Sequence, residues 1–378
     1  MEVVTLIFFG VILVYALFIG VLAYGLKKIP LFEPSDLEPQ TKFSIVIPFR
    51  NEAENLPNLL YSLSQLQYPT DHFEILFIDD SSEDNSIEII KKFSALTFNF
   101  KIVENVRASN SPKKDAIVTA IHQIQNEWIL TTDADCLVNR NWLKVLDNYI
   151  QIHNPEMISG AVSFLSGESF LAQFQQMDMM SLQGATIGSF GIEKPFMCNG
   201  ANFAYTKKLF KTVNGFDGND KMGSGDDVFL LQKAVGNKNI GIEKIHYLKS
   251  DEFLVLTNPL DSWKSVFNQR IRWASKASSY ESSFGKIAAL IVFAGNLAIV
   301  LSFILMLFSF FSFWNWYLLF AIKIGIDFLI LFQTGKFLKP KSVKFFLLIN
   351  LFYPFFSTSV ALCSLFGKYE WKGRTFQD

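Results

Sequence analysis

Acidic and amide side chains follow three short apolar runs of this chain, each at the point where the run ends. They are Asn51 and Glu52 just beyond Pro48, Asp79 and Asp80 after the second run, and Asp133 and Asp135 after the third. Short apolar runs bounded by polar residues are typical of buried strands, and ligands of an open parallel sheet bind beyond the carboxyl ends of its strands. The pattern predicts one ligand site at one sheet edge. Each acid or amide taken alone is equally compatible with capping the helix that follows.

Asp133 and Asp135 carry the sharpest signal of the three. Alternate residues at the end of a strand direct two carboxylates to the same side, which suits Mg²⁺ or Mn²⁺ held against a diphosphate. Such a cation would neutralise charge on a departing nucleotide. Lys113 or Lys114, on the segment before this run, would add positive charge for the phosphates, or would form an exposed surface pair.

Two glycine-containing segments are candidates for binding the second reactant. The first holds Asn199, Gly200 and Asn202, whose small size and amides permit close backbone approach and hydroxyl binding, or a tight structural turn. The second, 223–230, leads through Asp226 and Asp227 into an apolar helix. Direct displacement needs a base for a hydroxyl proton, and we expect Asp227 to be that base, with helix capping as the alternative role of the pair.

A basic and aromatic motif ends the polar part of the chain, in an amphipathic stretch that starts near Pro259. Arg272 can bind a diphosphate, and Trp273 can stack on a sugar or line a channel, with Gln269 one helical turn before them. An Arg/Trp helix at a membrane interface is the alternative, and both roles are compatible.

Strand-like and helix-like segments alternate around these residues. The expected strands are Phe43–Pro48, Phe73–Ile78, Phe100–Glu104 and Trp128–Thr132, and helical spacing covers Asn55–Gln67 and Ser86–Ala95. This alternation predicts a parallel α/β sheet.

The composition places the chain at a membrane. Half of its 378 residues are hydrophobic, 40 are Phe, and the mean hydropathy is +0.25. The net charge of −1 offers no bulk attraction to nucleic acid, so we expect no nucleic-acid partner. The three cysteines are far apart, which argues against a disulfide framework or a zinc site.

Uncharged segments at both ends of the chain are long enough to cross a bilayer. We expect an N-terminal anchor in 1–28, a cytoplasmic domain in 29–284, and a membrane region in 285–378 with spans at about 287–311, 314–333 and 345–366. This count puts the basic C-terminal tail outside the cell unless the segment containing Pro354 is kinked, re-entrant or interfacial, so the side of the C-terminus stays open. Lys323 and Asp327, four apart in the third span, are either a functional pair at membrane depth or, as we expect, neutralise each other near the interface.

Taken together, the motifs resemble those of glycosyltransferase family 2. V-I-P-x-x-N-E, D-D-x-S, D-x-D, N-G-A-N, a G-[ED]-D loop and Q-x-x-R-W occur in the family's order over about Phe43 to Ser275, with Asp226 where Glu is usual. The resemblance implies a GT-A fold, which is Rossmann-like with a mostly parallel sheet, here flanked by one N-terminal and about three C-terminal membrane helices.

The resemblance also implies roles for the residues of these motifs. A nucleotide-diphospho-sugar, of the UDP type, would be bound by Pro48, Asn51, Glu52, Asp79, Asp80, Lys113, Asp133 and Arg272. Asp133 and Asp135 would bind the metal, Mg²⁺ or Mn²⁺, and Asp227 would be the base. Asn199, Gly200, Asn202, Asp226, Gln269 and Trp273 would bind the acceptor.

The expected reaction is an inverting transfer to a hydroxyl of a membrane lipid at the cell inner or plasma membrane. The tail at Trp371 resembles the lipid- and carotenoid-glycosylating, ceramide-glucosyltransferase-like branch, and the apolar, Met-rich stretch 164–192 would suit an acyl chain or simply pack in the core. A processive polysaccharide synthase also carries Q-x-x-R-W and is the alternative enzyme. A membrane scaffold with a degenerate transferase domain is the alternative of another class, but none of the expected acids is missing.

Overall fold

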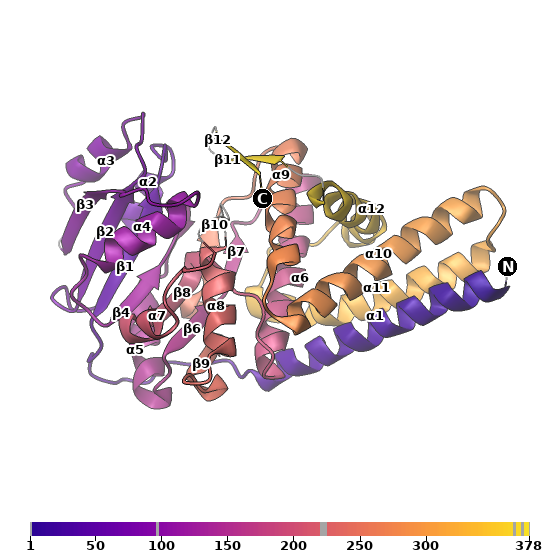
Figure 1. The fold of residues 1–378 in the computed structure, drawn as a ribbon, viewed down its shortest axis with the longest axis horizontal. Helices are drawn as coiled ribbons and strands as arrows, with labels where there is room; N and C mark the ends of the chain where they lie inside the picture. Colours follow the sequence, from indigo (N-terminus) through magenta and orange to yellow (C-terminus); the bar gives the residue numbers. More distant parts are fainter. Residues whose placement is uncertain (1, 96–97, 220–224, 366–367, 372–373, 378) are drawn as a thin grey trace.

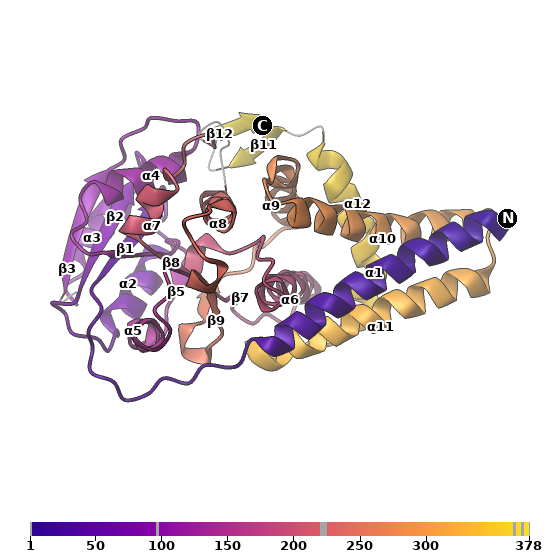
Figure 2. The ribbon, with the colours of Figure 1, turned by 60° about the horizontal axis from the view of Figure 1, so that its bottom comes forward.

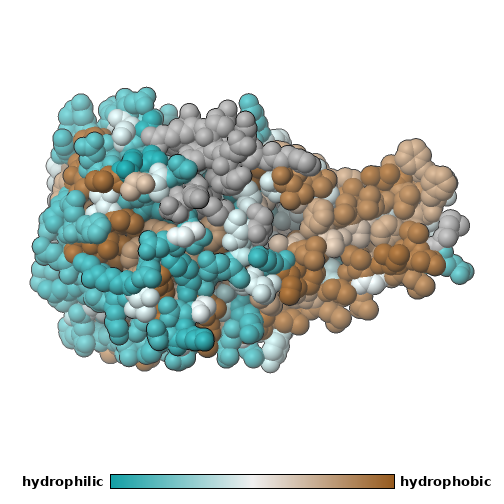
Figure 3. All heavy atoms as spheres, viewed as in Figure 1, coloured by the Kyte–Doolittle hydropathy of each residue, from teal (hydrophilic) through white to brown (hydrophobic). Residues whose placement is uncertain are grey.

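A computed structural model describes residues 2–95, 98–219, 225–365, 368–371 and 374–377. A polar α/β domain and an elongated apolar helical bundle lie end to end in it (Figure 1). Hydrophilic residues cover most of the visible face of the domain, and hydrophobic residues cover the bundle (Figure 3).

A seven-stranded mixed sheet forms the centre of the α/β domain. Its order is β3 (Asn99–Glu104), β2 (Phe73–Asp79), β1 (Phe43–Phe49), β4 (Trp128–Thr131), β8 (Phe203–Thr206), β6 (Met157–Gly160) and β9 (Ile245–Leu248). The first four strands are parallel, and β8 runs antiparallel to both its neighbours. All seven residues of β2 are buried, which explains why the strand is apolar between Glu74 and Asp79. The four predicted strands are confirmed within one residue at each end.

Short helices cover the sheet and connect its strands. They are α2 (Leu56–Ser64), α3 (Ser86–Lys92), α4 (Pro112–Ile121), α5 (Trp142–His153), α7 (Lys207–Thr212) and α8 (Asp226–Gly236). A second, three-stranded sheet contains β5 (Cys136–Leu137), β10 (Val255–Thr257) and β7 (Val162–Phe164). Single 3₁₀ turns occur at Gly200–Asn202, Ile242–Lys244, Asp251–Phe253 and Lys276–Ser279.

Four described helices are long and apolar enough to cross a membrane: α1 (Glu2–Lys28), α10 (Ser283–Leu307), α11 (Phe313–Leu338) and α12 (Phe346–Ser364). Their number and placement, one before the domain and three after it, agree with the prediction. Figure 2 shows α1 and α11 lying side by side, with the N-terminus at the end of the bundle that is far from the domain.

The helix α6 (Phe170–Gly191) joins the domain to the bundle, because it packs against both α1 and α11. Its contact with α1 depends on glycine. A Cβ atom added to Gly188 would lie 2.3 Å from the carbonyl oxygen of Leu22, and one added to Gly25 would lie 2.1 Å from that of Gly188. Most of α6 is buried, and Met177 and Met179 of its Met-rich stretch also border the cavity described below, so both uses expected of this stretch stay open.

The helix α12 has a different direction from the other three apolar helices. In Figures 1 and 2 it lies across the bundle near the domain, whereas α1, α10 and α11 run along it. At its start, Lys344 pairs with Glu168 at 3.8 Å, and beyond its end the hairpin of β11 (Lys368–Trp371) and β12 (Arg374–Gln377) contacts α9 (Trp263–Ser275). Both ends of α12 therefore lie on the domain side. Of the alternatives that the sequence left open, an interfacial helix suits this direction, and the side of the C-terminus stays a prediction.

Candidate active site

Two left-handed turns bring the loops after β1 and β2 together. Asn51 and Ser81 have φ values of 51° and 60°. Arg50 donates hydrogen bonds to the carbonyl oxygens of Asp80 and Ser81, at 2.7 and 2.6 Å, and pairs with Glu83 at 2.8 Å. The Asn51 side chain accepts a hydrogen bond from the Glu83 amide at 2.8 Å. Asn51 therefore shapes this loop and does not border the cavity described below.

The two acids after β2 have different surroundings. Asp80 borders the cavity, and its carboxylate accepts a hydrogen bond from Asn105 at 2.7 Å and lies 3.4 Å from Arg107. The carboxylate of Asp79 instead accepts a hydrogen bond from the Ser82 amide at 3.0 Å, as a turn residue does, and it does not border the cavity.

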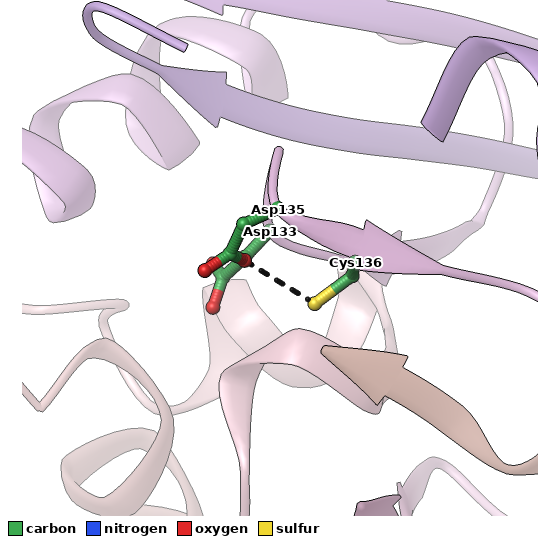
Figure 4. Close-up of side chains that lie close together, drawn as sticks. All are labelled: Asp133, Asp135 and Cys136. Carbon is green, nitrogen blue, oxygen red and sulfur yellow. Dashed lines mark hydrogen bonds between the residues drawn. The ribbon is translucent and has the colours of Figure 1, made fainter. Parts of the chain in front are cut away.

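The carboxylates of Asp133 and Asp135 lie close together just after β4, next to the thiol of Cys136 (Figure 4). Their ligand atoms and the Cys136 sulfur all lie within 4.8 Å of one another. Burial and then the charges of Asp135 and Asp133 raise the pKa of the Cys136 thiol well above its usual range. The thiol is therefore protonated and donates to Asp135 at 3.5 Å, so this cluster offers oxygen ligands, as a hard cation such as Mg²⁺ or Mn²⁺ prefers.

A half-buried ammonium group connects this pair of acids to the second pair. Lys113 on α4 lies 2.6 Å from Asp133 and 3.4 Å from Asp226. Burial alone would lower the pKa of Lys113, but the carboxylates of Asp133, Asp226 and Asp227 outweigh it and raise the pKa. Lys114 points elsewhere, donating to the carbonyl oxygen of Asn219, so the structure separates the two lysines that the sequence left as alternatives.

Asp226 and Asp227 start α8, after Gly225 with φ +88°. One oxygen of Asp227 accepts a hydrogen bond from the Gly200 amide at 2.8 Å, and the other accepts from its neighbour Val228 at 2.7 Å. Burial would raise the pKa of Asp227, but Lys276, Lys113 and these two amides hold it below its usual range. Burial raises the pKa of Asp226 in spite of Lys113. Of the motif's preceding residues, Gly223 and Ser224 lie outside the described residues.

The N-G-A-N segment lies between these acids and β4. Thr131 of β4 donates to the carbonyl oxygen of Gly200 at 2.7 Å. A Cβ atom on Gly200 would lie 2.9 Å from an Asp226 oxygen and 3.2 Å from Nζ of Lys113, so only glycine fits without displacing charged groups. Asn199 borders the cavity and caps the short turn by accepting from the Ala201 amide at 3.1 Å.

Asn202 does not take the position expected of an acceptor-binding residue. It is fully buried, its amide group donates to the carbonyl oxygens of Ala161 and Phe253, and it accepts from Trp142 at 3.1 Å. All of these bonds are internal, so the expectation of a substrate contact is corrected to a structural role. The alternative of a tight structural turn holds for this residue.

The Q-x-x-R-W residues lie on α9, and Gln269, Arg272 and Trp273 all border the cavity. The intervening Arg270 was not singled out from the sequence. It is buried, pairs with Asp178 of α6, and lies 4.2 Å from the Trp273 ring, while Tyr353 of α12 donates to the same Asp178 at 2.9 Å. Arg270 therefore links α9 to both neighbouring helices. Its place between two motif residues is the only signal that the sequence offered.

Lys276, one turn after Trp273, is a second residue that the sequence analysis missed. It is buried, borders the cavity and faces the acid pair, and burial lowers its pKa although Asp227 opposes the shift. A single lysine after the motif gave no signal, because only the fold brings it to α8.

One cavity of about 1680 Å³ connects Asp80, Lys113 and the two acid pairs with the membrane bundle. Its domain end is bordered by Asp80, Asp133 and Asp227, and its other end by Phe18, Ile330 and further residues of the apolar helices. This volume exceeds that of a drug-sized pocket, so a nucleotide-sized ligand leaves room for a second, apolar one.

Comparisons with known proteins agree with this arrangement. Residues 44–213 match the family model described as glycosyl transferase family 2. The glycosyltransferase AglE of Haloferax volcanii is 29% identical over 194 residues, which are 50% of this chain and 60% of that protein. An undecaprenyl-phosphate 4-deoxy-4-formamido-L-arabinose transferase of Yersinia pestis is 35% identical over 99 residues, 26% of this chain and 30% of that protein.

Longer relatives and one solved structure extend the comparison. The poly(ribitol-phosphate) beta-N-acetylglucosaminyltransferase TarS of Staphylococcus aureus is 30% identical over 117 residues, 31% of this chain and 20% of that protein. The chain thus spans between a fifth and three fifths of these curated relatives. The mannosyltransferase PcManGT from Pyrobaculum calidifontis, solved with GDP-Man and Mn²⁺, superposes with a TM-score of 0.54 at 15% identity, covering 96% of this chain and 97% of that one. At this identity the superposition shows a shared fold.

Proposed function

Residues 44–213 form a glycosyltransferase family 2 domain, and from this we propose that the protein transfers a sugar from a nucleotide-diphospho-sugar to a hydroxyl group of a membrane lipid. The observation that carries the proposal is the single cavity that joins Asp133, Asp135 and Asp227 to the apolar wall of the bundle. A soluble acceptor would not need an apolar wall to bind.

The donor is placed at the carboxyl ends of the parallel strands. Pro48, Glu52 and Asp80 border the cavity there and are proposed to contact the nucleoside, of the uridine type. Lys113 and Arg272 border the same space and supply positive charge for the diphosphate. Asn51 and Asp79 support these loops from outside the cavity.

Asp133 and Asp135 are proposed to hold a divalent cation, Mg²⁺ or Mn²⁺, against the diphosphate. The cation supplies Lewis-acid stabilisation of the leaving nucleotide. One Asp133 oxygen is paired with Lys113, which brings the lysine next to the proposed diphosphate position. The two carboxylates offer oxygen ligands, which a hard cation such as Mg²⁺ or Mn²⁺ prefers.

Asp227 is proposed as the general base. Its carboxylate is held by two backbone amides and stays ionised, so it can accept the proton of an acceptor hydroxyl as that oxygen attacks the sugar. A single displacement of this kind inverts the anomeric centre. Asp226, on the same turn, is kept close to Lys113 and helps to position that lysine.

The charges of the site favour a hydroxyl over a lipid phosphate as the acceptor group. Asp227 is held in its ionised form, so an anionic group placed directly beside its carboxylate would be repelled. A phosphate acceptor would also need no base. Transfer to a lipid phosphate, as the name of the Yersinia pestis relative implies for that protein, is therefore the outcome to test against.

The catalytic domain is proposed to face the cytoplasm. Lys27, Lys28, Lys336 and Lys339 all lie at the domain end of the bundle, and basic residues at one end of membrane helices mark the cytoplasmic side.

The test incubates membranes that contain the protein with a panel of nucleotide sugars, total lipid extract and Mn²⁺ or Mg²⁺, followed by mass spectrometry of the lipids. A metal-dependent glycolipid with one sugar on a hydroxyl is expected. A lipid phosphosugar, or a long polymer as a processive synthase would make, would contradict the proposal. If the Asp135→Asn substitution does not reduce hydrolysis of the donor, that result would favour a protein without transferase activity.

A further inference from the structure

A network of polar side chains lies inside the membrane bundle. Asp327 of α11 accepts a hydrogen bond from the Tyr15 hydroxyl of α1 at 2.6 Å and pairs with Lys323 at 2.6 Å through its other oxygen. Nζ of Lys323 lies 5.1 Å from the centre of the Tyr15 ring. Gly295 of α10 lets the ring pack closely, since a Cβ atom there would lie 2.5 Å from it.

The network lies deep in the bundle. Asp327 is eleven residues before the end of α11 at Leu338, and Tyr15 is thirteen before the end of α1 at Lys28. At a rise of about 1.5 Å per residue these separations are about 16 and 20 Å. Since the hydrocarbon core is about 30 Å thick, the network lies near its middle.

Asp327 and Tyr15 border the same cavity as Asp133 and Asp227. Lys323 is 3% exposed, whereas the Asp327 side chain keeps 14% of its surface exposed. The ion pair is therefore not enclosed on all sides, because its carboxylate faces the cavity.

An ionised carboxylate has about four positions at which it can accept a hydrogen bond, and the two described partners fill two of them. The remaining capacity faces the cavity, whose wall here holds apolar groups such as Ile330 and Leu331 together with Tyr353, whose hydroxyl is donated to Asp178. A helix contact alone would be served as well by apolar side chains, because burying an ion pair costs desolvation.

We propose that Asp327, with Tyr15 and Lys323 holding it, binds a second hydrogen-bond donor on the acceptor lipid: a hydroxyl or amide N–H carried along its chain and placed at mid-membrane depth. This rests on the proposed function, since it assigns the far end of the same cavity to the acceptor. The lipid would then be recognised at two points, the reacting hydroxyl at Asp227 and the chain donor at Asp327.

Photo-crosslinking of the full chain in nanodiscs tests the site without requiring turnover. The probes are long-chain primary alcohols that carry a diazirine in the chain, with a hydroxyl, an amide or no polar group beside it, at successive chain positions. At one position we expect a polar probe to label the segments around Asp327 and Tyr15 about tenfold more than the plain probe, in line with a hydrogen bond to a buried charge. The hydroxyl and amide probes distinguish the two sources of the donor. Equal labelling by all probes at every position would overturn the proposal.

A paired substitution isolates the polar group from the shape of the cavity. Lys323→Met with Asp327→Leu removes both charges together and leaves no unpaired ion. The preference for the polar probe should fall to within about twofold, and a preserved preference would overturn the proposal. The control is Phe328→Leu, on the same helix with a side chain that is 51% exposed on the bundle surface, which should keep the wild-type ratio.

The same probes used as acceptors separate this inference from the function on which it rests. Labelling at Asp327 without sugar transfer to any lipid would refute the proposed function and leave the binding site standing. Equal transfer to plain and polar lipids, with equal labelling, would refute the site and leave the function standing.

Discussion

At the scale of single residues, the site consists of acids whose charges are balanced in different ways. Asp227 is held ionised by amides and by Lys276 and Lys113, while burial favours the protonated form of Asp226. Two adjacent carboxylates thus have pKa values shifted in opposite directions, which is typical of acid–base sites.

Removing the proposed base should abolish most transfer. Asp227→Asn keeps the shape of the side chain but cannot accept a proton, and general-base catalysis contributes about 10²- to 10⁴-fold, so kcat should fall by that factor. The assay is sugar transfer at saturating donor, with Asp71→Asn, an exposed residue, as the control. A loss below about fivefold would assign the proton to another group.

The pH dependence follows from the lowered pKa of Asp227. A base with a depressed pKa is active above that pKa and loses activity as the pH falls through it, so the acid limb of kcat/KM should lie below about pH 4, the ordinary carboxylate range. The measurement is the pH profile of wild-type transfer in a pH-stable lipid system. An acid limb centred near pH 6 would point to a different base.

Gly200 gives a prediction about close packing in the site. Gly200→Ala places a methyl group 2.9 Å from an Asp226 oxygen and 3.2 Å from Lys113, so these groups must shift, and a misplacement of about 1 Å costs about 100-fold in rate. Transfer assays should show that loss with an almost unchanged melting temperature. Gly236→Ala, where an added Cβ meets no atom within 4 Å, is the matched control.

At the scale of elements, α6 and α9 connect the chemistry to the membrane. The Asp178–Arg270 pair ties α6 to α9, and Tyr353 adds α12 to the same carboxylate. The helix that carries Arg272 and Trp273 is thereby fixed relative to the bundle. The proposed lipid acceptor would lie against the same helices.

The contact of α1 with α6 should be sensitive to a single methyl group. Gly188→Ala brings a Cβ atom to 2.3 Å from a backbone oxygen of α1, which cannot move without shifting the helix. Overpacking of this kind costs about 1–3 kcal/mol of the free energy of unfolding, so the melting temperature in detergent should fall. Gly10→Ala, on α1 with no atom within 4 Å, should leave it unchanged. Equal melting temperatures for both variants would argue against the packing of α6 on α1.

At the scale of the whole molecule, the direction of α12 decides on which side the chain ends. Since α12 lies across the bundle and its following hairpin contacts α9, a reporter fused after residue 378 should lie on the same side as the catalytic domain. A reporter fused before Glu2 should lie on the opposite side. Protease accessibility in sealed vesicles measures both, and a C-terminal reporter on the side of the N-terminal one would show that α12 spans the bilayer.

Local chemistry explains how much could be predicted from the sequence. The strands β1, β2 and β4 are apolar runs that end in acids, and burial on both sheet faces requires that pattern, so their positions and their shared edge followed directly. The helices α1, α10 and α11 could be predicted in a similar way, because an uncharged segment has to reach a certain length to cross a bilayer.

Only the tertiary structure decided what depends on partners distant in the chain. The sequence alone could not choose between Lys113 and Lys114, assign Asn202 to internal hydrogen bonds, or bring Lys276 and Arg270 to the site, because each outcome depends on which helix packs beside which strand. The direction of α12 could not be predicted either. Its composition is that of a membrane-spanning helix, but contacts with α9 and α10 set its direction. Composition and spacing determined which chemistry this chain carries and that it meets a membrane. Packing determined that the two meet in one cavity.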